Sequence, residues 1–200
     1  MTTHVDFLYD FGSPNAFLSH CAIPKIEARA DIRFDYVPVL LGGIFKETGN
    51  VSPAVSLQGI RNKGEYTRIE TQRWLTRFDV EMYPPNPHFP VNTLMMMRGA
   101  VFARDKDFYP AYIDAMYTCM WRESRKMDEL EIFAGALKEF DLPADDILTG
   151  IQDPAVKQGL ITNTSAAVER GAFGSPTFFV GDEIWFGKET LRDIEEGAAA

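Results

Sequence analysis

Strand-type and helix-type patterns follow one another along this chain in an order that few folds accommodate. Residues 4–10 alternate apolar and polar side chains, as a β-strand with one buried face does, and residues 32–41 repeat that pattern. From residue 42 to about residue 170 the apolar positions recur at helical spacing, and strand chemistry returns only after Gly171. Because 200 residues are too few for two independent large domains, the pattern predicts one α/β core interrupted by helices.

A helix is expected between the first two strands. Gly12 permits a turn, the Ser13 hydroxyl can cap a helix, and Pro14 suits the first helical position because its missing N–H costs nothing there. Apolar residues at helical spacing continue to about Arg29. The first part of the chain therefore predicts a β-α-β unit.

The helical middle is broken by a proline-rich segment, residues 83–93, which holds four prolines and must be irregular. Asn92 or Thr93 can cap the helix that follows it. Ahead of this segment lies a locally basic stretch, beside which a small anion can sit. Its basic side chains are Arg61, Lys63, Arg68, Arg73 and Arg77.

The last part of the chain predicts a β-hairpin, with the strands TFFV and EIWF joined by a turn at Gly181-Asp182, and then an acidic helix over residues 188–196. The order β-α-β, helices, β-β-α resembles a thioredoxin-like fold with an all-α insertion. We therefore predict a thioredoxin-like α/β domain made of residues 1–41 and 171–200, and a helical insertion domain over residues 42–170.

Charge and hydropathy exclude several partners. The chain has 29 acidic and 20 basic side chains, a formal charge of -9, so no wide surface attracts a polyanion and we expect no nucleic-acid partner. The amino terminus lacks the basic start and apolar run of a signal peptide, and no stretch approaches the ~18 apolar residues of a membrane span. We expect a cytoplasmic protein with no membrane partner.

The cysteines and histidines show neither a redox pair nor the spacing of metal ligands. Cys21 and Cys119 are too far apart for a C-x-x-C motif, and they are expected to be buried small apolar residues in a reducing compartment. We predict no metal site, because the histidines do not cluster with them. The histidines are His4, His20 and His88.

The start of the first helix is the place where a thioredoxin-like fold holds its reactive sulfur, because the helix dipole stabilises a thiolate there. Ser13 and Ala16 occupy the two positions of a C-x-x-C motif, so this chain offers no sulfur of its own. Any thiol must come from a bound small molecule, and the Ser13 hydroxyl can donate its proton to that sulfur. The ordinary role of Ser13, a helix cap, is compatible with this one.

Pro176, directly ahead of a predicted strand, is the second feature that points to a thioredoxin-like binding site. We expect a cis peptide bond between Ser175 and Pro176, a bond that is rare unless a structure requires it. In thioredoxin-like proteins the residue before this proline pairs its main chain with a peptide-like ligand, as an added strand would. Ser175 would then contribute its backbone N–H and C=O.

Four ordered motifs carry a resemblance to a known family. They are YDFGSPNAFL at the start, Thr48-Gly49-Asn50 with Asn62-Lys63-Gly64-Glu65-Tyr66, Asn86-Pro87-His88-Phe89-Pro90-Val91-Asn92, and GAFGSPTFFV with WFGKETL at the end. Together they resemble the kappa-class glutathione transferases and the bacterial 2-hydroxychromene-2-carboxylate isomerases, within the wider DsbA-like group. The resemblance covers most of the chain.

The resemblance implies that glutathione is the cofactor. Ser13 would donate a hydrogen bond to its sulfur, Asn50 and Lys63 would hold the tripeptide, and Ser175, ahead of Pro176, would pair with its cysteinyl backbone. From sequence alone, Asn50 is equally a turn residue and Lys63 equally a solvated surface lysine. The resemblance also implies a homodimer.

The γ-glutamyl end of the tripeptide would lie at Lys188-Glu189, where the family usually has a small or polar residue followed by Asp. Glu189 can still accept a hydrogen bond from an ammonium group, although it is one methylene longer. The proline-rich segment, with His88 and Asn92, would border a small aromatic substrate. Structural roles, an exposed histidine and a helix cap, are the alternatives for these two residues.

The isomerase relatives imply interconversion of 2-hydroxychromene-2-carboxylate and trans-o-hydroxybenzylidenepyruvate in the degradation of aromatic compounds. Reversible addition of a thiolate would turn the double bond into a single bond that rotates before the thiolate leaves. Two alternatives stay open. One is a transferase that conjugates electrophiles or reduces peroxides, and the other is a non-catalytic module that binds peptides.

Overall fold

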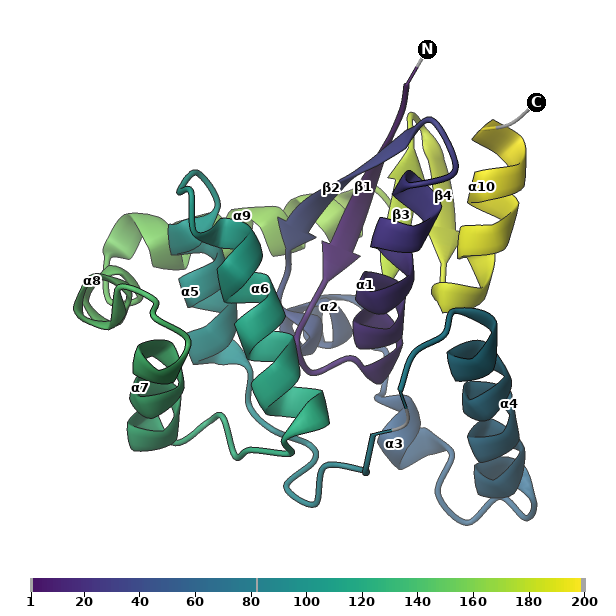
Figure 1. The fold of residues 1–200 in the computed structure, drawn as a ribbon, viewed down its shortest axis with the longest axis horizontal. Helices are drawn as coiled ribbons and strands as arrows, with labels where there is room; N and C mark the ends of the chain where they lie inside the picture. The colour runs from purple at the N-terminus through teal and green to yellow at the C-terminus, as the bar shows by residue number, and fades with distance from the viewer. Residues whose placement is uncertain (1, 82, 199–200) are drawn as a thin grey trace.

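A mixed four-stranded sheet forms the centre of the molecule in the computed structural model, which describes residues 2–81 and 83–198 (Figure 1). The strand order is β2-β1-β3-β4, with β1 parallel to β2 and antiparallel to β3. The strands are β1 (Thr3–Tyr9), β2 (Ile32–Pro38), β3 (Thr177–Val180) and β4 (Glu183–Phe186). The two ends of the chain therefore build one sheet, as a thioredoxin-like fold requires.

Helices occupy most of the chain outside the sheet. The α-helices are α1 (Pro14–Glu27), α2 (Leu41–Thr48), α3 (Pro53–Ser56), α4 (Lys63–Arg77), α5 (Leu94–Ala103), α6 (Tyr109–Tyr117), α7 (Leu130–Glu139), α8 (Ala144–Gly150), α9 (Pro154–Glu169) and α10 (Leu191–Ala198). A π-helical turn (Thr118–Arg122) continues α6, and a 3₁₀ turn (Lys188–Thr190) precedes α10. Among the described residues, no helix has the length and apolar character that a membrane span needs.

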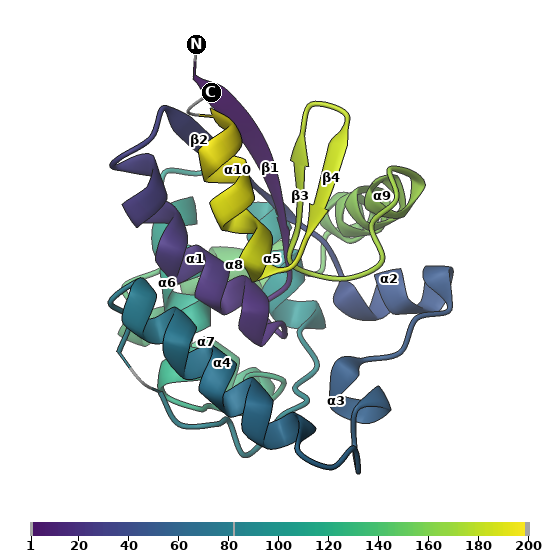
Figure 2. The ribbon, with the colours of Figure 1, turned by 90° about the vertical axis from the view of Figure 1, so that its right-hand side faces the viewer.

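The sheet is covered on both faces. Figure 2 shows α1 and α10 on one face and α2 and α9 on the other. On the first face Phe7 of β1 stacks on Phe178 of β3, with ring centroids 5.2 Å apart. On the second face Leu8 and Phe179 are buried with Ile44 of α2. Successive residues of β1 are therefore buried on opposite sides, which explains why this strand is more apolar than simple alternation predicts.

The helical part shares its core with the sheet. One continuous apolar cluster runs from Phe7 in β1 through Met97 in α5 and Tyr112 in α6 to Phe133 in α7. All four side chains are fully buried. The two parts of the chain therefore share one hydrophobic core. Their division into a thioredoxin-like domain and a helical insertion domain stays a prediction.

The predicted elements agree with the structure in type and order. The first helix begins at Pro14 with Ser13 as its cap, and the hairpin turns at Gly181-Asp182. The second strand is shorter than expected, because residue 41 already begins α2. The final helix is also preceded by a 3₁₀ turn that the acidic pattern did not reveal.

The proline-rich segment, residues 83–93, has no helix or strand, as predicted. It is anchored by Asn86, a buried side chain whose Nδ2 donates to the carbonyls of Met120, at 2.7 Å, and Arg125, at 3.2 Å. The segment also has a cis peptide bond between Phe89 and Pro90, which the sequence analysis did not predict. Asn86 therefore ties the segment to the end of the π-helical turn.

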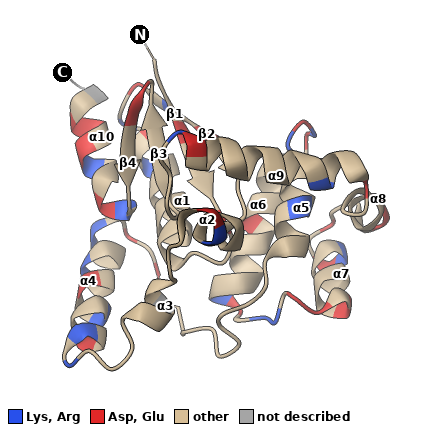
Figure 3. Cartoon of the chain, turned by 180° about the vertical axis from the view of Figure 1, so that it is seen from behind, with Lys and Arg blue, Asp and Glu red and all other residues tan. Residues whose placement is uncertain are grey.

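The basic stretch after Arg61 becomes the surface helix α4, whose charges are mixed along its length (Figure 3). Arg68 pairs with Glu65 at 2.8 Å, so part of the positive charge is neutralised locally. Only the second half of α4 carries buried side chains, Trp74 and Leu75. The helix is therefore held to the rest of the molecule mainly at that end.

Two glycines in helix interiors allow a matched test of this packing. A Cβ on Gly99 in α5 would lie 2.1 Å from the hydroxyl of the buried Tyr112, which donates to the Met96 carbonyl at 2.7 Å. Gly135 in α7 has no neighbour within 4 Å of such a Cβ. We expect Gly99→Ala to lower the free energy of unfolding by about 1–3 kcal/mol through overpacking, and Gly135→Ala to raise it by about 0.5–1 kcal/mol through helix propensity.

Urea denaturation of the two glycine variants measures both effects. A Gly99→Ala protein as stable as the wild type would show that α5 and α6 are not packed as described.

Candidate functional site

The turn between β1 and α1 fixes Ser13 at the start of the helix. The Ser13 backbone N–H donates to the Asp10 carbonyl at 3.0 Å, and its Oγ accepts from the Ala16 N–H at 3.1 Å. Pro14 occupies the first helical position, as predicted. The side chain is buried at the end of the helix that carries the positive partial charge, a place that favours an anion.

Ser13 also faces the other end of the chain. Its Oγ donates to the Ser175 carbonyl at 2.7 Å, and the Ser175-Pro176 peptide bond is cis. The predicted cis bond is confirmed, and the structure brings Ser13 and Ser175 together across 162 positions of sequence. Ser13 thus acts as a helix cap and as a hydroxyl donor at the same time.

The segment before Pro176 is braced by Asn50, which follows α2. The Asn50 Nδ2 donates to the Phe173 carbonyl at 2.7 Å, and its Oδ1 accepts from the Val51 N–H at 2.8 Å. Asn50 is therefore a turn residue, and it also contacts the segment that leads to the cis-proline. Asn50 sets the position of the chain that leads into Ser175.

Asp10, at the end of β1, is a residue of this turn that the sequence analysis missed. Its carboxylate accepts from the Gly12 N–H at 2.8 Å and from the Leu41 N–H at 2.7 Å, and it also bonds the Thr93 side chain. Burial raises the pKa of the Asp10 carboxyl above its usual value, and these three hydrogen bonds oppose that rise. Asp10 thereby ties the Ser13 turn to the starts of α2 and α5. An acidic residue directly after a buried strand was the signal available.

Lys188 is buried in the 3₁₀ turn before α10, with 1% of its surface exposed. Its Nζ donates to both carboxylate oxygens of Glu70 in α4, at 2.8 and 2.9 Å, and to the neighbouring Glu189. The cation also lies 5.3 Å from the ring centroid of Trp74. The predicted pair Lys188-Glu189 is therefore engaged with a third residue, Glu70, that the sequence analysis missed.

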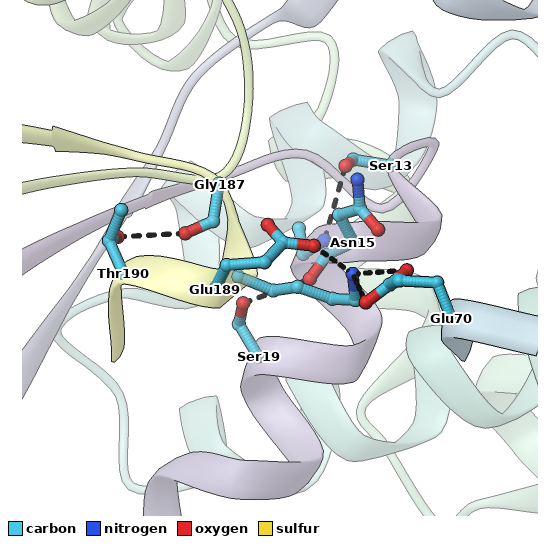
Figure 4. Close-up of polar contacts among 9 residues, drawn as sticks. Ser13, Asn15, Ser19, Glu70, Gly187, Glu189 and Thr190 are labelled. Atoms are coloured by element: carbon cyan, nitrogen blue, oxygen red, sulfur yellow. Dashed lines mark hydrogen bonds and ion pairs between the residues drawn. The ribbon is translucent and has the colours of Figure 1, made fainter. Parts of the chain in front are cut away.

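Figure 4 shows how these groups are arranged near the start of α1. Ser13 caps α1 and Asn15 lies in its first turn, and the Glu70 and Glu189 carboxylates approach from α4 and the 3₁₀ turn. A groove of about 490 Å³ opens beside the two carboxylates, between α4 and α10. Three arginines line it and give it groups that bind carboxylates: Arg73, Arg77 and Arg192.

The other three predicted residues lie elsewhere. Lys63 is the exposed first residue of α4, and the backbone N–H of the exposed His88 donates to Asn86 Oδ1 at 2.8 Å. Asn92 accepts from the Leu94 N–H, the first of α5, at 3.0 Å, and Thr93 occupies the N-cap position. Within residues 2–81 and 83–198, none of the three forms a hydrogen bond with Ser13 or Ser175.

Aromatic side chains back the Ser13 turn. The Trp121 indole N–H donates to the Phe11 carbonyl at 2.8 Å, two residues before Ser13. Its ring centroid lies 5.7 Å from that of Phe89 in the proline-rich segment and 6.3 Å from that of Phe17 in α1. The helical part therefore contributes an apolar, aromatic side to the region around the turn.

Chemically, this arrangement suits an anion that also has a peptide-like part. The helix start and the Ser13 hydroxyl stabilise negative charge, while the main chain at Ser175 offers strand-type pairing. Glu70 and Glu189 can accept from an ammonium group, and the arginine-lined groove can receive a carboxylate.

Comparison with known proteins agrees with this geometry. The family model described as DSBA-like thioredoxin domain matches residues 4–197. A solved structure of 2-hydroxychromene-2-carboxylate isomerase superposes with a TM-score of 0.82 and 25% identity, covering 98% of this chain and 94% of that one.

The chain is also similar in sequence to an isomerase and to a kappa-class glutathione transferase. The 2-hydroxychromene-2-carboxylate isomerase of Pseudomonas putida is 26% identical over 192 residues, which is 96% of this chain and 92% of the relative. Glutathione S-transferase kappa 1 of Rattus norvegicus is 26% identical over 182 residues, 86% of this chain and 79% of the relative. The resemblance inferred from the four motifs is confirmed.

Asp10 gives a pH-dependent prediction. Because its pKa is raised in the folded chain, folding favours the protonated carboxyl, and this contribution to stability is lost as pH rises through the folded pKa. We expect the free energy of unfolding of the wild type, minus that of Asp10→Asn, to be larger at about pH 4 than at about pH 7. Thr93→Val removes one opposing hydrogen bond and should move this transition to higher pH.

Urea denaturation across a pH series measures the Asp10 contribution. A wild-type advantage that is constant with pH, or that grows as pH rises, would contradict the assignment.

The buried cluster at Lys188 gives a second prediction. Glu70→Ala leaves the buried ammonium with one carboxylate partner, so we expect a loss of about 1–3 kcal/mol in the free energy of unfolding. Adding Lys188→Met removes the buried charge and should recover part of that loss. Thermal and urea unfolding of both proteins measure this, and strictly additive losses would show that the two side chains are not coupled.

Proposed function

The chain belongs to the DsbA-like thioredoxin domain family, and from that premise we propose that it binds glutathione at the start of α1 and catalyses a glutathione-dependent isomerisation. The substrate class that we propose is a hydroxychromene-type aromatic acid that opens to a conjugated keto acid. The relatives named 2-hydroxychromene-2-carboxylate isomerase support this substrate class.

The observation that carries the proposal is the hydrogen bond between Ser13 and the Ser175 carbonyl. A hydroxyl stands at a helix start where a dithiol protein of this fold has a cysteine, and Ala16 stands at the second position. A family member with this pair needs a sulfur from a bound molecule. When bound, glutathione supplies a thiolate that adds reversibly to a conjugated double bond.

The residues on both sides of Ser13 fit a tripeptide. Turning the Ser13 hydroxyl from the Ser175 carbonyl toward a sulfur provides one donor, and the helix start favours the ionised form. The freed Ser175 carbonyl and its N–H can pair with a peptide backbone. Asn50 holds this segment in place through Phe173.

Charged groups near Ser13 suit the ends of the tripeptide. Glu70 and Glu189 can accept hydrogen bonds from its ammonium group. The groove lined by Arg73, Arg77 and Arg192 can bind a carboxylate. Lys63, on the first turn of α4, is proposed to meet the second carboxylate. The proposed contacts of His88 and Asn92 with the substrate rest on the resemblance alone.

The chain's own groups would lower the barrier in two ways. Ser13 keeps the sulfur ionised near neutral pH, and the aromatic side formed by Trp121 and Phe89 excludes water from a flat substrate. Homodimer formation, a cytoplasmic location and a part in aromatic degradation stay predictions.

A glutathione transferase is the second candidate, because the chain is also similar to glutathione S-transferase kappa 1 of two further animals. The two activities differ in the fate of glutathione. An isomerase turns over at constant glutathione, whereas a conjugating transferase consumes it stoichiometrically. Affinity for extended peptides without affinity for glutathione would instead indicate a peptide-binding module.

The site gives a matched pair of variants. Ser13→Ala removes a donor to the thiolate, so we expect kcat/KM to fall by about 10- to 100-fold and its pH profile to shift to higher pH. Ser175→Ala should retain most of the activity, because only the main chain of Ser175 is used. A spectrophotometric assay with 2-hydroxychromene-2-carboxylate, with and without glutathione, measures both variants.

The assay separates the alternatives. Activity of the wild type that does not depend on glutathione, or an unshifted pH profile in a fully active Ser13→Ala protein, would overturn the proposed function. Equal losses in Ser13→Ala and Ser175→Ala would show that the Ser175 side chain, whose hydroxyl donates to the Leu8 carbonyl, is needed as well as its main chain.

A further inference from the structure

A second cavity, of about 110 Å³, lies where α2, α5 and α9 meet. Figure 3 shows α9 running beside α2 and α5 in the view from behind, with basic residues on α5 and α9. None of the residues that line the cavity belongs to the site around Ser13. It therefore needs a separate explanation.

The walls of the cavity are mostly apolar. Leu94 of α5 and Leu160 and Ile161 of α9 line it. The hydroxyl of Thr164, which also lines the cavity, is already satisfied, since it accepts from the Leu40 N–H at 2.9 Å and donates to the Leu160 carbonyl at 2.7 Å. The other polar side chains that line the cavity are charged.

Two cations and one anion line the same small space. Arg98 of α5 contributes a buried Nε that forms no hydrogen bond with any described residue. Lys157 of α9 donates to Gln152 at 3.1 Å, and Glu47 of α2 accepts from the Ser165 hydroxyl at 3.0 Å. A buried guanidinium N–H without an acceptor is uncommon, because a buried donor that forms no hydrogen bond costs free energy. Arg98 therefore lines the cavity as a cation with an unsatisfied N–H.

We propose that this cavity binds a small monocarboxylate with a short apolar chain. A guanidinium holds a carboxylate through two parallel N–H donors, and Arg98 lines the cavity without a carboxylate partner among the described residues. Lys157 adds a second positive charge at the cavity. The apolar walls then receive the hydrocarbon part of the ligand.

The charge of Glu47 and the volume of the cavity limit which carboxylates can bind. Glu47 repels negative charge in the same cavity, so a single carboxylate is favoured over a dianion such as phosphate. A cavity of ~150 Å³ admits benzene in another protein, so this smaller one suits an acid of about three to five carbons. Butyrate is the probe that matches both limits.

Isothermal titration calorimetry of the full chain with butyrate tests the site. We expect a Kd on the order of 1 mM for a ligand this small. The neutral amide butyramide has nearly the same shape and should bind at least about tenfold more weakly, because it cannot pair with the guanidinium as an anion.

Three variants isolate the charges of the cavity. Arg98→Met should weaken butyrate binding by about tenfold and Lys157→Met by about threefold. Glu47→Gln keeps an acceptor for Ser165 but removes the like charge, so it should strengthen binding by about threefold. This gain also tests the proposal if Arg98→Met does not fold, which circular dichroism reports.

Several outcomes would overturn the site. They are equal binding of butyrate and butyramide, tighter binding of inorganic phosphate than of butyrate, or unchanged affinity in a folded Arg98→Met protein. Ser13→Ala should bind butyrate as the wild type does, so this test is independent of the proposed glutathione chemistry. Loss of butyrate binding in Ser13→Ala would place the ligand at the Ser13 site instead.

Discussion

The hydrogen bond from the Ser13 hydroxyl to the Ser175 carbonyl is the contact on which the arrangement of the site depends. It joins the first helix to the segment that enters β3, and β1 and β3 pair in the same sheet. Because both groups are held by backbone geometry, one by a helix start and one by a cis-proline segment, they meet without large side chains. The main chain fixes the site, and the side chains determine what it binds.

The helical part contributes supports to this turn from a distance. Asp10 connects the turn to the starts of α2 and α5, and Trp121 holds the Phe11 carbonyl. Glu70 reaches Lys188 from α4, a helix that otherwise contacts the rest mainly through its second half. The helical part therefore shapes the surroundings of Ser13 as well as extending the core.

The sequence predicts the local features of this site well and its distant partners poorly. A glycine, a serine and a proline after a strand identify the start of α1, and a proline before a strand identifies Pro176. The roles of Asp10, Glu70 and Asn86 were not predicted, because each of these side chains bonds to residues far away in the sequence. Glu70 and Lys188, for example, are 118 positions apart, and no pattern in one sequence pairs them.

The order of the strands has a consequence for biosynthesis. On the ribosome, β1, α1 and β2 emerge early, whereas β3, which lies between β1 and β4 in the sheet, is made only after residue 176. Until then β1 has a neighbour on one side only, and Ser13 has no carbonyl opposite it. The contact between Ser13 and the Ser175 carbonyl therefore forms only after the segment that precedes β3 has been made, long after α1.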